Sequence, residues 1–510
     1  MRLILKVPLI IISALVTLNI FLSSWWLLNN DFYINFDISR DLILLHDILD
    51  GNYVTLIGPH SGTVPGLFHG PAWYYFSLPA LVLGYGNPLF LGWFWLALSI
   101  LLLLIVYFTA LKLFDHTTAI WSCLIFSANS IANSINDEKY FYNPYGAVLL
   151  SPVFFLLLRL YLKELRLIYL FSLVFILGLL VQFQMAFGIP VLILSFLYLS
   201  VHNYFKKKLS HLAVFAVILL PLSTFILFDI KNDFLQFKTV IDYISASKEF
   251  YSPVSFVLSR FDQLLLDNFR MLFGNSILLQ LFFSGCFFGL LFYQLSKLKF
   301  QADNFIVIFS YFYFGFGIIT FLFKGEIVNY YWPFLPVVII VFCELLKLFP
   351  KYIGIAIAVI LIVLNIYNGT KLITDYSMEE QGFASWKYNL RMATFIYSDS
   401  SEDFGYFIYK PNMFGFSQRY AMEYADRLFE NSSFPFTKKP LTYLIIIEDA
   451  KSETDSNIEG WKVSDVKITA SPEKAYQFKD YRIERYRLSN TELKIEANPN
   501  LMLLNSGYFR

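Results

Sequence analysis

Long apolar stretches without charges constrain this chain more than any other feature of its sequence. A stretch of roughly 17 to 25 such residues is long enough to cross a bilayer as a helix. Candidate stretches lie near residues 4–28, 88–111, 117–135, 145–162, 166–187, 189–203, 211–229, 271–296, 303–323, 327–346 and 350–369. Because 57% of the residues are hydrophobic and 15% are charged, we predict a polytopic α-helical membrane protein with about eleven transmembrane helices.

Net charge and cysteine content exclude several classes of partner and site. The formal net charge is +1, so no overall field attracts nucleic acid or an acidic polymer. The cysteines Cys123, Cys286 and Cys343 fall within apolar runs and offer neither metal-ligand spacing nor a disulfide framework. The first apolar segment resembles a signal peptide but has no small-residue cleavage site, so we expect a retained helix.

Basic residues between the apolar stretches predict the orientation of the chain. With a cytoplasmic N-terminus, every cytoplasmic turn carries Lys or Arg, as the positive-inside rule requires. These turns hold Lys112, the group Arg159, Lys163 and Arg166, the run 206–208, the pair Lys297 and Lys299, and the pair Lys347 and Lys351. The same orientation places four segments outside the membrane, namely 29–87, 134–144, 230–270 and the chain beyond about residue 370. The short apolar run from Trp73 to Leu83 is expected to lie in the outer interface.

The composition changes to a soluble pattern beyond residue 370. Strand-like alternation appears at 404–409, 442–447 and 481–488, and an amphipathic helix is indicated at 417–429. We therefore predict a transmembrane domain over 1–369, which includes the external loop 29–87, and a small extracytoplasmic α/β domain over 370–510.

The segment 31–51 carries the residues with the clearest catalytic chemistry. Its apolar residues recur at helical spacing, and Asp37 and Arg40 share one end of the expected amphipathic helix. A carboxylate can deprotonate an attacking hydroxyl while a cation stabilises a leaving phosphate, which is what inverting sugar transfer from a phosphate requires. Alternatives stay open, because Asp37 is also a favoured N-cap residue and Arg40 can snorkel to lipid phosphates.

The order of features in the N-terminal part resembles the GT-C glycosyltransferases. One N-terminal span is followed by an external Asp-x-x-Arg helix, a Gly-Pro loop and the run His69-Gly70-Pro71-Ala72-Trp73-Tyr74-Tyr75. Within that superfamily it is most similar to the aminoarabinose transferase and protein mannosyltransferase group and its bacterial relatives. The likeness covers roughly the first 150 residues, and the later helices only in layout.

The resemblance implies a sugar donor linked to polyprenyl phosphate and an extracytoplasmic lipid, glycan or protein acceptor in a bacterial plasma membrane. Asp37 matches the catalytic acidic position, Arg40 matches a phosphate-contacting arginine, and His69 falls where aminoarabinose transferases have a lysine. Two departures affect these roles. The common Asp-Glu pair is here Asp37-Ile38, and a histidine at position 69 does not carry the fixed charge of a lysine.

The external patch 136–144 offers further polar residues. We expect Lys139 to assist in binding the donor phosphate, and Asp137 or Glu138 to hold a divalent metal ion or the sugar. A solvated loop with an internal ion pair predicts the same residues. The sequence indicates no cofactor apart from this candidate metal ion.

Residues near other outer helix ends are candidates for lining the same site. Gln184 can bond sugar hydroxyls or link helices. Tyr330 and Tyr331 can line a lipid or sugar cavity, although an interface girdle predicts them equally well. Arg260 and Arg270 in the loop 230–270 are further phosphate candidates.

A multi-span lipid or solute transporter is the alternative function. It would also have many spans and a polar central patch. No inverted repeat joins the two halves of the chain, and few ionisable residues lie deep within the spans, which favours a glycosyltransferase. The sequence contains no P-loop, dinucleotide fingerprint, zinc-binding set or nucleophile elbow.

Overall fold

A computed structural model describes most of the chain. The described residues are 9–51, 54–61, 64, 66–129, 142–245, 253–273, 276–298, 303–323, 330–350, 382–410, 415–447, 455–478 and 480–503, with scattered residues between 352 and 374. The chain packs as two compact units, which we call the helical unit and the mixed unit. The helical unit comprises residues 1–24, 55–76 and 95–372, and the mixed unit comprises 25–54, 77–94 and 373–510.

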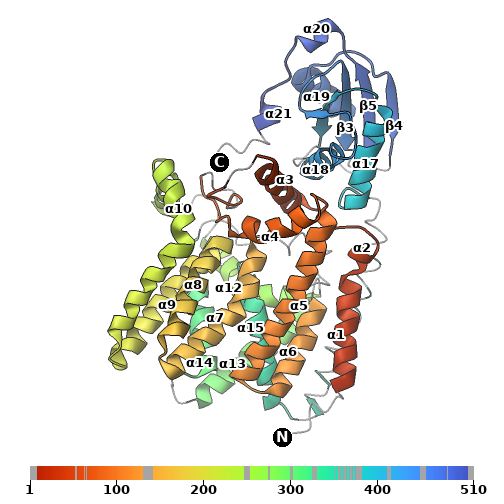
Figure 1. The fold of residues 1–510 in the computed structure, drawn as a ribbon. Helices are drawn as coiled ribbons and strands as arrows, with labels where there is room; N and C mark the ends of the chain where they lie inside the picture. The colour runs from red at the N-terminus through yellow and green to blue at the C-terminus, as the bar shows by residue number, and fades with distance from the viewer. Residues whose placement is uncertain are drawn as a thin grey trace. The chain divides into compact units, whose positions relative to one another are not determined.

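The helical unit is built from helices (Figure 1), most of which are apolar in sequence. They are α1 (Leu9–Ser23), most of α5 (Pro88–Leu113), α6 (His116–Asn129), α7 (Pro144–Glu164), α8 (Leu167–Phe183), α9 (Met185–Phe205), η1 (Leu209–Ile218), α10 (Leu219–Lys231), α11 (Leu235–Ser245), α12 (Pro253–Phe273), α13 (Ile277–Lys297), α14 (Phe305–Thr320), η2 (Trp332–Phe334), α15 (Leu335–Leu345) and η3 (Leu346–Leu348). Helix α15 is almost wholly buried. In helix α7, the ring of Phe155 packs edge-on against Phe312 and tilted against Phe334.

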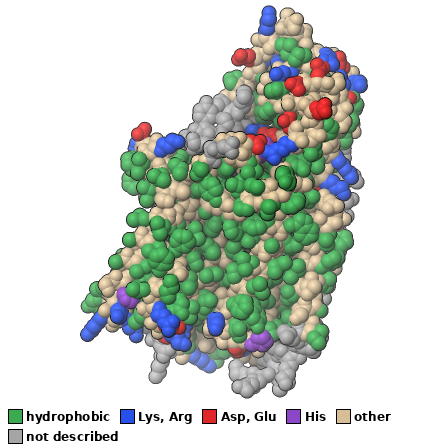
Figure 2. Space-filling model, viewed as in Figure 1, with side chains coloured by type: hydrophobic (Ala, Val, Ile, Leu, Met, Phe, Trp, Pro, Cys, Tyr) green, Lys and Arg blue, Asp and Glu red, His purple; other side chains and the backbone are tan. Residues whose placement is uncertain are grey.

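Five helices are long and apolar enough to cross a membrane, among the residues that the structure describes. They are Pro88–Leu113, Pro144–Glu164, Met185–Phe205, Leu209–Lys231 and Ile277–Lys297, and shorter apolar helices include Leu167–Phe183 and Phe305–Thr320. Figure 2 shows hydrophobic side chains over most of the visible face of this unit. Exposed apolar side chains such as Phe108 and Leu220 are suited to lipid rather than water. The total of about eleven spans stays a prediction.

The segment 230–270, predicted as a loop, forms two helices instead. Helix α11 lies within it, and helix α12 begins within it and extends to Phe273, so that the next helix begins at Ile277 rather than near 271. Helix α12 carries Asp262, Asp267 and Arg270 among its apolar residues. A search for uncharged stretches passes over such a helix because its charges interrupt the apolar run.

The mixed unit contains a five-stranded sheet at the C-terminal end of the chain. The strands are β1 (Phe404–Tyr409), β2 (Ser433–Pro435), β3 (Leu441–Ile447), β4 (Lys474–Gln477) and β5 (Tyr481–Arg487), in the order β2-β1-β3-β5-β4. The first three strands in that order are parallel, and the last two join antiparallel. The predicted small C-terminal sheet is thus confirmed, and three of its strands lie where alternation placed them.

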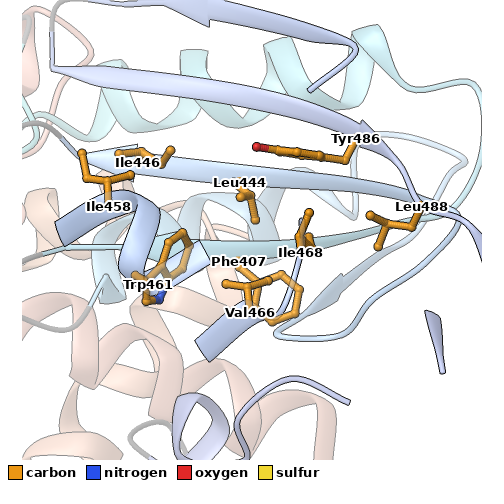
Figure 3. Close-up of a cluster of buried hydrophobic side chains, with 9 residues drawn as sticks. All are labelled: Phe407, Leu444, Ile446, Ile458, Trp461, Val466, Ile468, Tyr486 and Leu488. Carbon is orange, nitrogen blue, oxygen red and sulfur yellow. The ribbon is translucent and has the colours of Figure 1, made fainter. Parts of the chain in front are cut away.

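Helices cover this sheet and contribute to its core. They are α17 (Trp386–Asp399), α18 (Phe416–Ala425), α19 (Asp455–Trp461), α20 (Asn490–Leu493) and α21 (Asn500–Leu503). Figure 3 shows one buried cluster, in which side chains of β1, β3 and β5 meet Ile458 and Trp461 of α19. The strands supply alternate residues such as Leu444 and Ile446 to this face, because successive side chains of a strand point to opposite faces of the sheet.

The mixed unit also includes chain from far earlier in the sequence. Short helix α2 (Trp25–Leu28), helix α3 (Phe36–Gly51), the end of α4 (Ala72–Leu83) and the first turns of α5 belong to it. Helix α3 packs against α18 of the C-terminal segment. The mixed unit is thus assembled from three separate segments of the chain, and the predicted domain division between residues 369 and 370 stays a prediction.

Candidate active site

Helix α3 starts at Phe36, and a neighbouring asparagine caps it. The Asn35 Oδ1 atom accepts a hydrogen bond from the backbone N–H of Ile38 at 2.8 Å, which is the bond that an N-cap side chain makes. Capping by Asp37, the alternative considered from sequence, is therefore wrong. Asp37 instead lies in the first turn, where the positive end of the helix dipole favours a carboxylate.

Arg40 lies between two carboxylates on the first turns of α3. Its Nη1 atom donates to Asp37 Oδ1 at 2.7 Å. Its Nη2 and Nε atoms donate to Asp41 Oδ1 at 2.8 and 3.0 Å. Asp37 and Arg40 lie three positions apart and share one face of the helix, whereas Asp41 directly follows Arg40. The structure thus brings together the predicted pair Asp37 and Arg40 and adds Asp41.

The three side chains differ in their access to solvent. The Asp41 side chain is 7% exposed, that of Arg40 is 20% exposed and that of Asp37 is 33% exposed. Asp41 is therefore suited to holding the guanidinium in place, whereas Asp37 can meet an incoming molecule. Sequence reasoning missed the part of Asp41, although its spacing from Asp37 was the available signal.

The loop that carries His69 forms a tight ladder within the helical unit. Gly58 N–H donates to the carbonyl of His69 at 2.8 Å, and His69 N–H donates to the carbonyl of Pro59 at 2.9 Å. His60 and Phe68 form a bridge beside this pair, and their rings lie 4.4 Å apart. His69 itself is buried, at 7% exposure. The turn-rich sequence therefore builds an ordered loop that fixes the His69 backbone.

Gly70 joins this loop to the end of helix α8. Its N–H donates to the carbonyl of Gln182 at 2.9 Å. A Cβ atom at Gly70 would lie 1.6 Å from Gln182 Oε1, so only glycine fits beside this amide. The Gln182 side chain donates in turn to the Pro221 carbonyl and to Thr224 Oγ1. The contact ties the loop to α8 and α10.

Gln184 occupies the break between helices α8 and α9. The Gln184 backbone is extended, and Gln184 is buried at 3% exposure. Its Oε1 atom accepts no hydrogen bond from the described residues. Beside it, Asn143 Nδ2 at the start of α7 donates to the carbonyl of Phe183 at 2.7 Å. Trp73 packs on Phe183 with 6.2 Å between ring centroids. The helix break thus places buried amides next to the aromatic run that follows His69.

The remaining predicted site residues fall into two groups. Lys139, Asp137 and Glu138 lie outside the residues that the structure describes. Tyr330 is half-buried, and Tyr331 is 1% exposed and packs against aromatic rings of α14. The cavity-lining role of the two tyrosines stays a prediction.

The arginines of helix α12 have different surroundings. Arg260 is 2% exposed and donates to Gln263 Oε1 at 3.0 Å and to the carbonyl of Phe323 at 3.1 Å. Arg270 instead forms ion pairs with Asp262 and Asp267. Both are thus tied to neighbouring groups of the helical unit.

Within the described ranges, no group of three or more His, Cys, Asp and Glu side chains is arranged to hold a metal ion. A cavity of about 300 Å³ lies in the helical unit, lined by residues that include Arg159, Asn304, Glu344 and Lys347. None of the predicted site residues lines it.

The fold described above resembles that of ArnT, a GT-C glycosyltransferase, and the described residues include five helices long and apolar enough to cross a membrane. Two structures of ArnT from Cupriavidus metallidurans are among the solved structures that share this fold. The structure bound to undecaprenyl phosphate matches with a TM-score of 0.60 at 10% identity, over 94% of this chain and 98% of that one. The apo structure matches with a TM-score of 0.61 at 11% identity, over 93% and 97%.

An oligosaccharyltransferase of Archaeoglobus fulgidus tethered to an acceptor peptide is also similar, with a TM-score of 0.48 at 14% identity over 83% of this chain and 63% of that one. No protein-family model matches the sequence. No curated protein matches it either. At these identities the likeness concerns the fold alone.

Proposed function

We propose that the protein is a glycosyltransferase that transfers a sugar from a polyprenyl-phosphate donor to an acceptor hydroxyl with inversion, with Asp37 as the general base. The observation that carries the proposal is the arrangement on α3, where a solvent-accessible carboxylate shares a guanidinium with a buried one. The fold supports the donor class, because the ArnT structure that shares it is described as bound to undecaprenyl phosphate.

Donor binding would exchange one partner of Arg40. A donor phosphate competes with Asp37 for the Nη1 atom of Arg40, while the buried Asp41 keeps the guanidinium oriented through Nε and Nη2. Arginine suits this role because its planar fork can serve a carboxylate and a phosphate at once. Asp37 is then released from its ion pair and becomes free to accept a proton.

The transfer step follows from the two charges. The acceptor oxygen attacks the anomeric carbon as Asp37 takes the hydroxyl proton, and the bond between that carbon and the phosphate oxygen breaks. The phosphate leaves with the bonding electrons, and Arg40 stabilises its growing negative charge. No separate acid is needed because a phosphate leaves without protonation.

The other predicted residues would serve the same reaction. We infer that His69, Lys139 and the amide of Gln184 contact the donor, and that the site opens on the extracytoplasmic side of a bacterial plasma membrane. The N-terminus would be cytoplasmic and the C-terminal segment extracytoplasmic, with a lipid, glycan or protein as acceptor. The sugar itself is open, because hexosyl and pentosyl donors satisfy the same chemistry.

The test is release of polyprenyl phosphate from a panel of polyprenyl-phosphate sugars by the purified protein in lipid nanodiscs. Asp37→Asn keeps the shape of the side chain but removes the base, and should abolish turnover in a folded protein. Asp47→Asn is the matched control, because Asp47 lies ten residues further along the same helix, roughly 15 Å away at 1.5 Å per residue. It should retain turnover.

Two outcomes would contradict the proposal. Turnover by Asp37→Asn equal to wild type would remove Asp37 as base. No release by wild type from any donor, together with movement of labelled lipid across proteoliposomes, would favour a transporter.

A further inference from the structure

The chain just before helix α3, which carries Asp37, is paired with the C-terminal segment. The contact between Asp31 and Ser385 joins residues that are 354 positions apart in the sequence. Tyr33 and Ser385 form an antiparallel bridge. Ile34 N–H donates to the carbonyl of Ala384 at 2.8 Å, and Trp386 N–H donates to the carbonyl of Phe32 at 2.9 Å. We call the paired stretches 31–34 and 384–387 the clamp.

A buried aspartate holds the clamp together. Asp31 is 0% exposed, and its Oδ1 atom accepts from the N–H of Phe32 at 2.7 Å and from the N–H of Lys387 at 2.9 Å. Its Oδ2 atom accepts from Ser385 Oγ at 2.7 Å. Burial raises the pKa of Asp31 above its ordinary value, and these hydrogen bonds oppose that rise. Buried polar groups are normally hydrogen-bonded. Removing the Asp31 carboxylate would therefore leave its three donors without an acceptor.

The same C-terminal segment continues to hold α3 along its length. The rings of Phe36 and Phe416 lie 5.1 Å apart at the start of the helix. Near its end, Asp50 pairs with Arg427 at 2.7 Å. Helix α3 is therefore held at its start by α18 and near its end by the turn that follows α18, while the clamp fixes the chain that enters α3.

We propose that the C-terminal segment positions the catalytic helix, and that Asp31 is the positioning residue through which it acts. This inference rests on the proposed function of Asp37. Asp31 lies six residues before Asp37 and only five before the first residue of α3, so the clamp sets where the helix begins. A general base displaced by about 1 Å can lose a factor of about 100 in rate, which makes the position of this helix start decisive for transfer.

The first test compares two substitutions at Asp31. Asp31→Ala removes the acceptor of all three hydrogen bonds and should lower kcat by up to about 100-fold, with little change in the KM for the donor. Asp31→Asn should stay close to wild type. Its Oδ1 atom can accept both backbone N–H groups, and the Ser385 hydroxyl can turn to accept from its amide.

A matched control separates positioning from stability of the sheet. Asp399 likewise accepts three hydrogen bonds, in its case from the side chains of Tyr443, Tyr476 and Arg485, and these residues all lie within the C-terminal segment. Asp399→Ala should lower the thermal stability at least as much as Asp31→Ala, yet leave kcat near wild type. Equal losses of kcat in both variants would overturn the proposal, because stability alone would then explain the effect.

A disulfide provides the rescue. Tyr33 and Ser385 form the pair without mutual backbone hydrogen bonds, in which Cα atoms lie about 4.5 Å apart, within the range that a disulfide spans. Tyr33→Cys and Ser385→Cys, added to Asp31→Ala, should restore kcat when oxidised and lose it again on reduction. Wild type treated identically controls for the three native cysteines. A fully cross-linked protein as slow as Asp31→Ala would refute the inference.

Hydrogen exchange tests the clamp without any turnover. Amides of residues 36–51 should exchange faster in Asp31→Ala than in wild type or Asp399→Ala. Unchanged exchange would overturn the clamp even if the enzyme is active. If the wild-type protein transfers no sugar but these amides still exchange faster in Asp31→Ala, the clamp would be supported and the proposed function would be contradicted.

Discussion

Replacing Arg40 by alanine should separate its structural role from its catalytic one. The Asp41 side chain is 7% exposed and takes two of the three hydrogen bonds that Arg40 makes on α3. Removing one partner of a buried ion pair costs about 3 to 5 kcal/mol. Because Arg40 is itself a fifth exposed, water can reach the site, and we expect a loss of about 3 kcal/mol, the lower end of that range.

The double variant then divides the two effects. Arg40→Ala with Asp41→Ala removes both members of the buried pair, so most of the lost stability should return. Turnover should not return. The cation that stabilises the leaving phosphate is still missing, and removing one such group typically costs a factor of about 100 to 1,000 in kcat.

The assay pairs denaturant unfolding in detergent, which gives the free energy of unfolding, with release of polyprenyl phosphate under single-turnover conditions. Asp41→Ala alone should retain measurable turnover, because Arg40 can still pair with Asp37. An Arg40→Ala variant as stable as wild type would show that Asp41 does not depend on Arg40. Recovery of turnover in the double variant would show that Arg40 has no part in the transfer.

Three further predictions concern other parts of the molecule. Gly70→Ala should lower turnover at least about 10-fold by displacing Gln182, whereas Gly285→Ala, whose Cβ would meet no described atom within 4 Å, should be silent in the same release assay. Burial, with a smaller contribution from the positive charge of Arg427, lowers the pKa of His46, so folding favours the neutral imidazole. The stability that this gives the folded protein is present above about pH 6.5 and should be lost as the pH falls through the lowered pKa. Melting scans from pH 7.5 to 5 should therefore show a steeper fall in melting temperature for wild type than for His46→Gln. Arg427→Ala breaks an ion pair with an exposed Asp50 and should cost less than about 1 kcal/mol by denaturant unfolding.

Much of the fold could be predicted because it follows local patterns. Apolar runs marked helices such as α5 and α7 to within two residues, and alternation marked β1 at its observed bounds. The pattern failed where a helix is amphipathic and charged, as in α12, and where a strand is short and polar, as in β4. Such elements depend on neighbours that the local sequence does not reveal.

The site could be predicted only where its residues lie within one helix. The spacing of Asp37 and Arg40 indicated their contact in advance. The pairing of Asp31 with Ser385 joins segments more than 350 residues apart, and no local signal marks it. The contact of Gly70 with Gln182 could not be predicted either. A glycine indicates that another group approaches the backbone closely, but the sequence does not identify that group.

The position after Asp37 shows how the helix accommodates a change in its acidic residues. Where the resembling family has an Asp-Glu pair, this chain has Ile38, which is 4% exposed and belongs to the buried face of α3. A carboxylate at this buried position would cost free energy unless it were paired. Asp41 lies four residues beyond Asp37, one turn along the same face, and already shares Arg40 with it. A second carboxylate is therefore present at the guanidinium although the position after Asp37 is apolar. It comes from the residue that follows Arg40, one helical turn beyond Asp37.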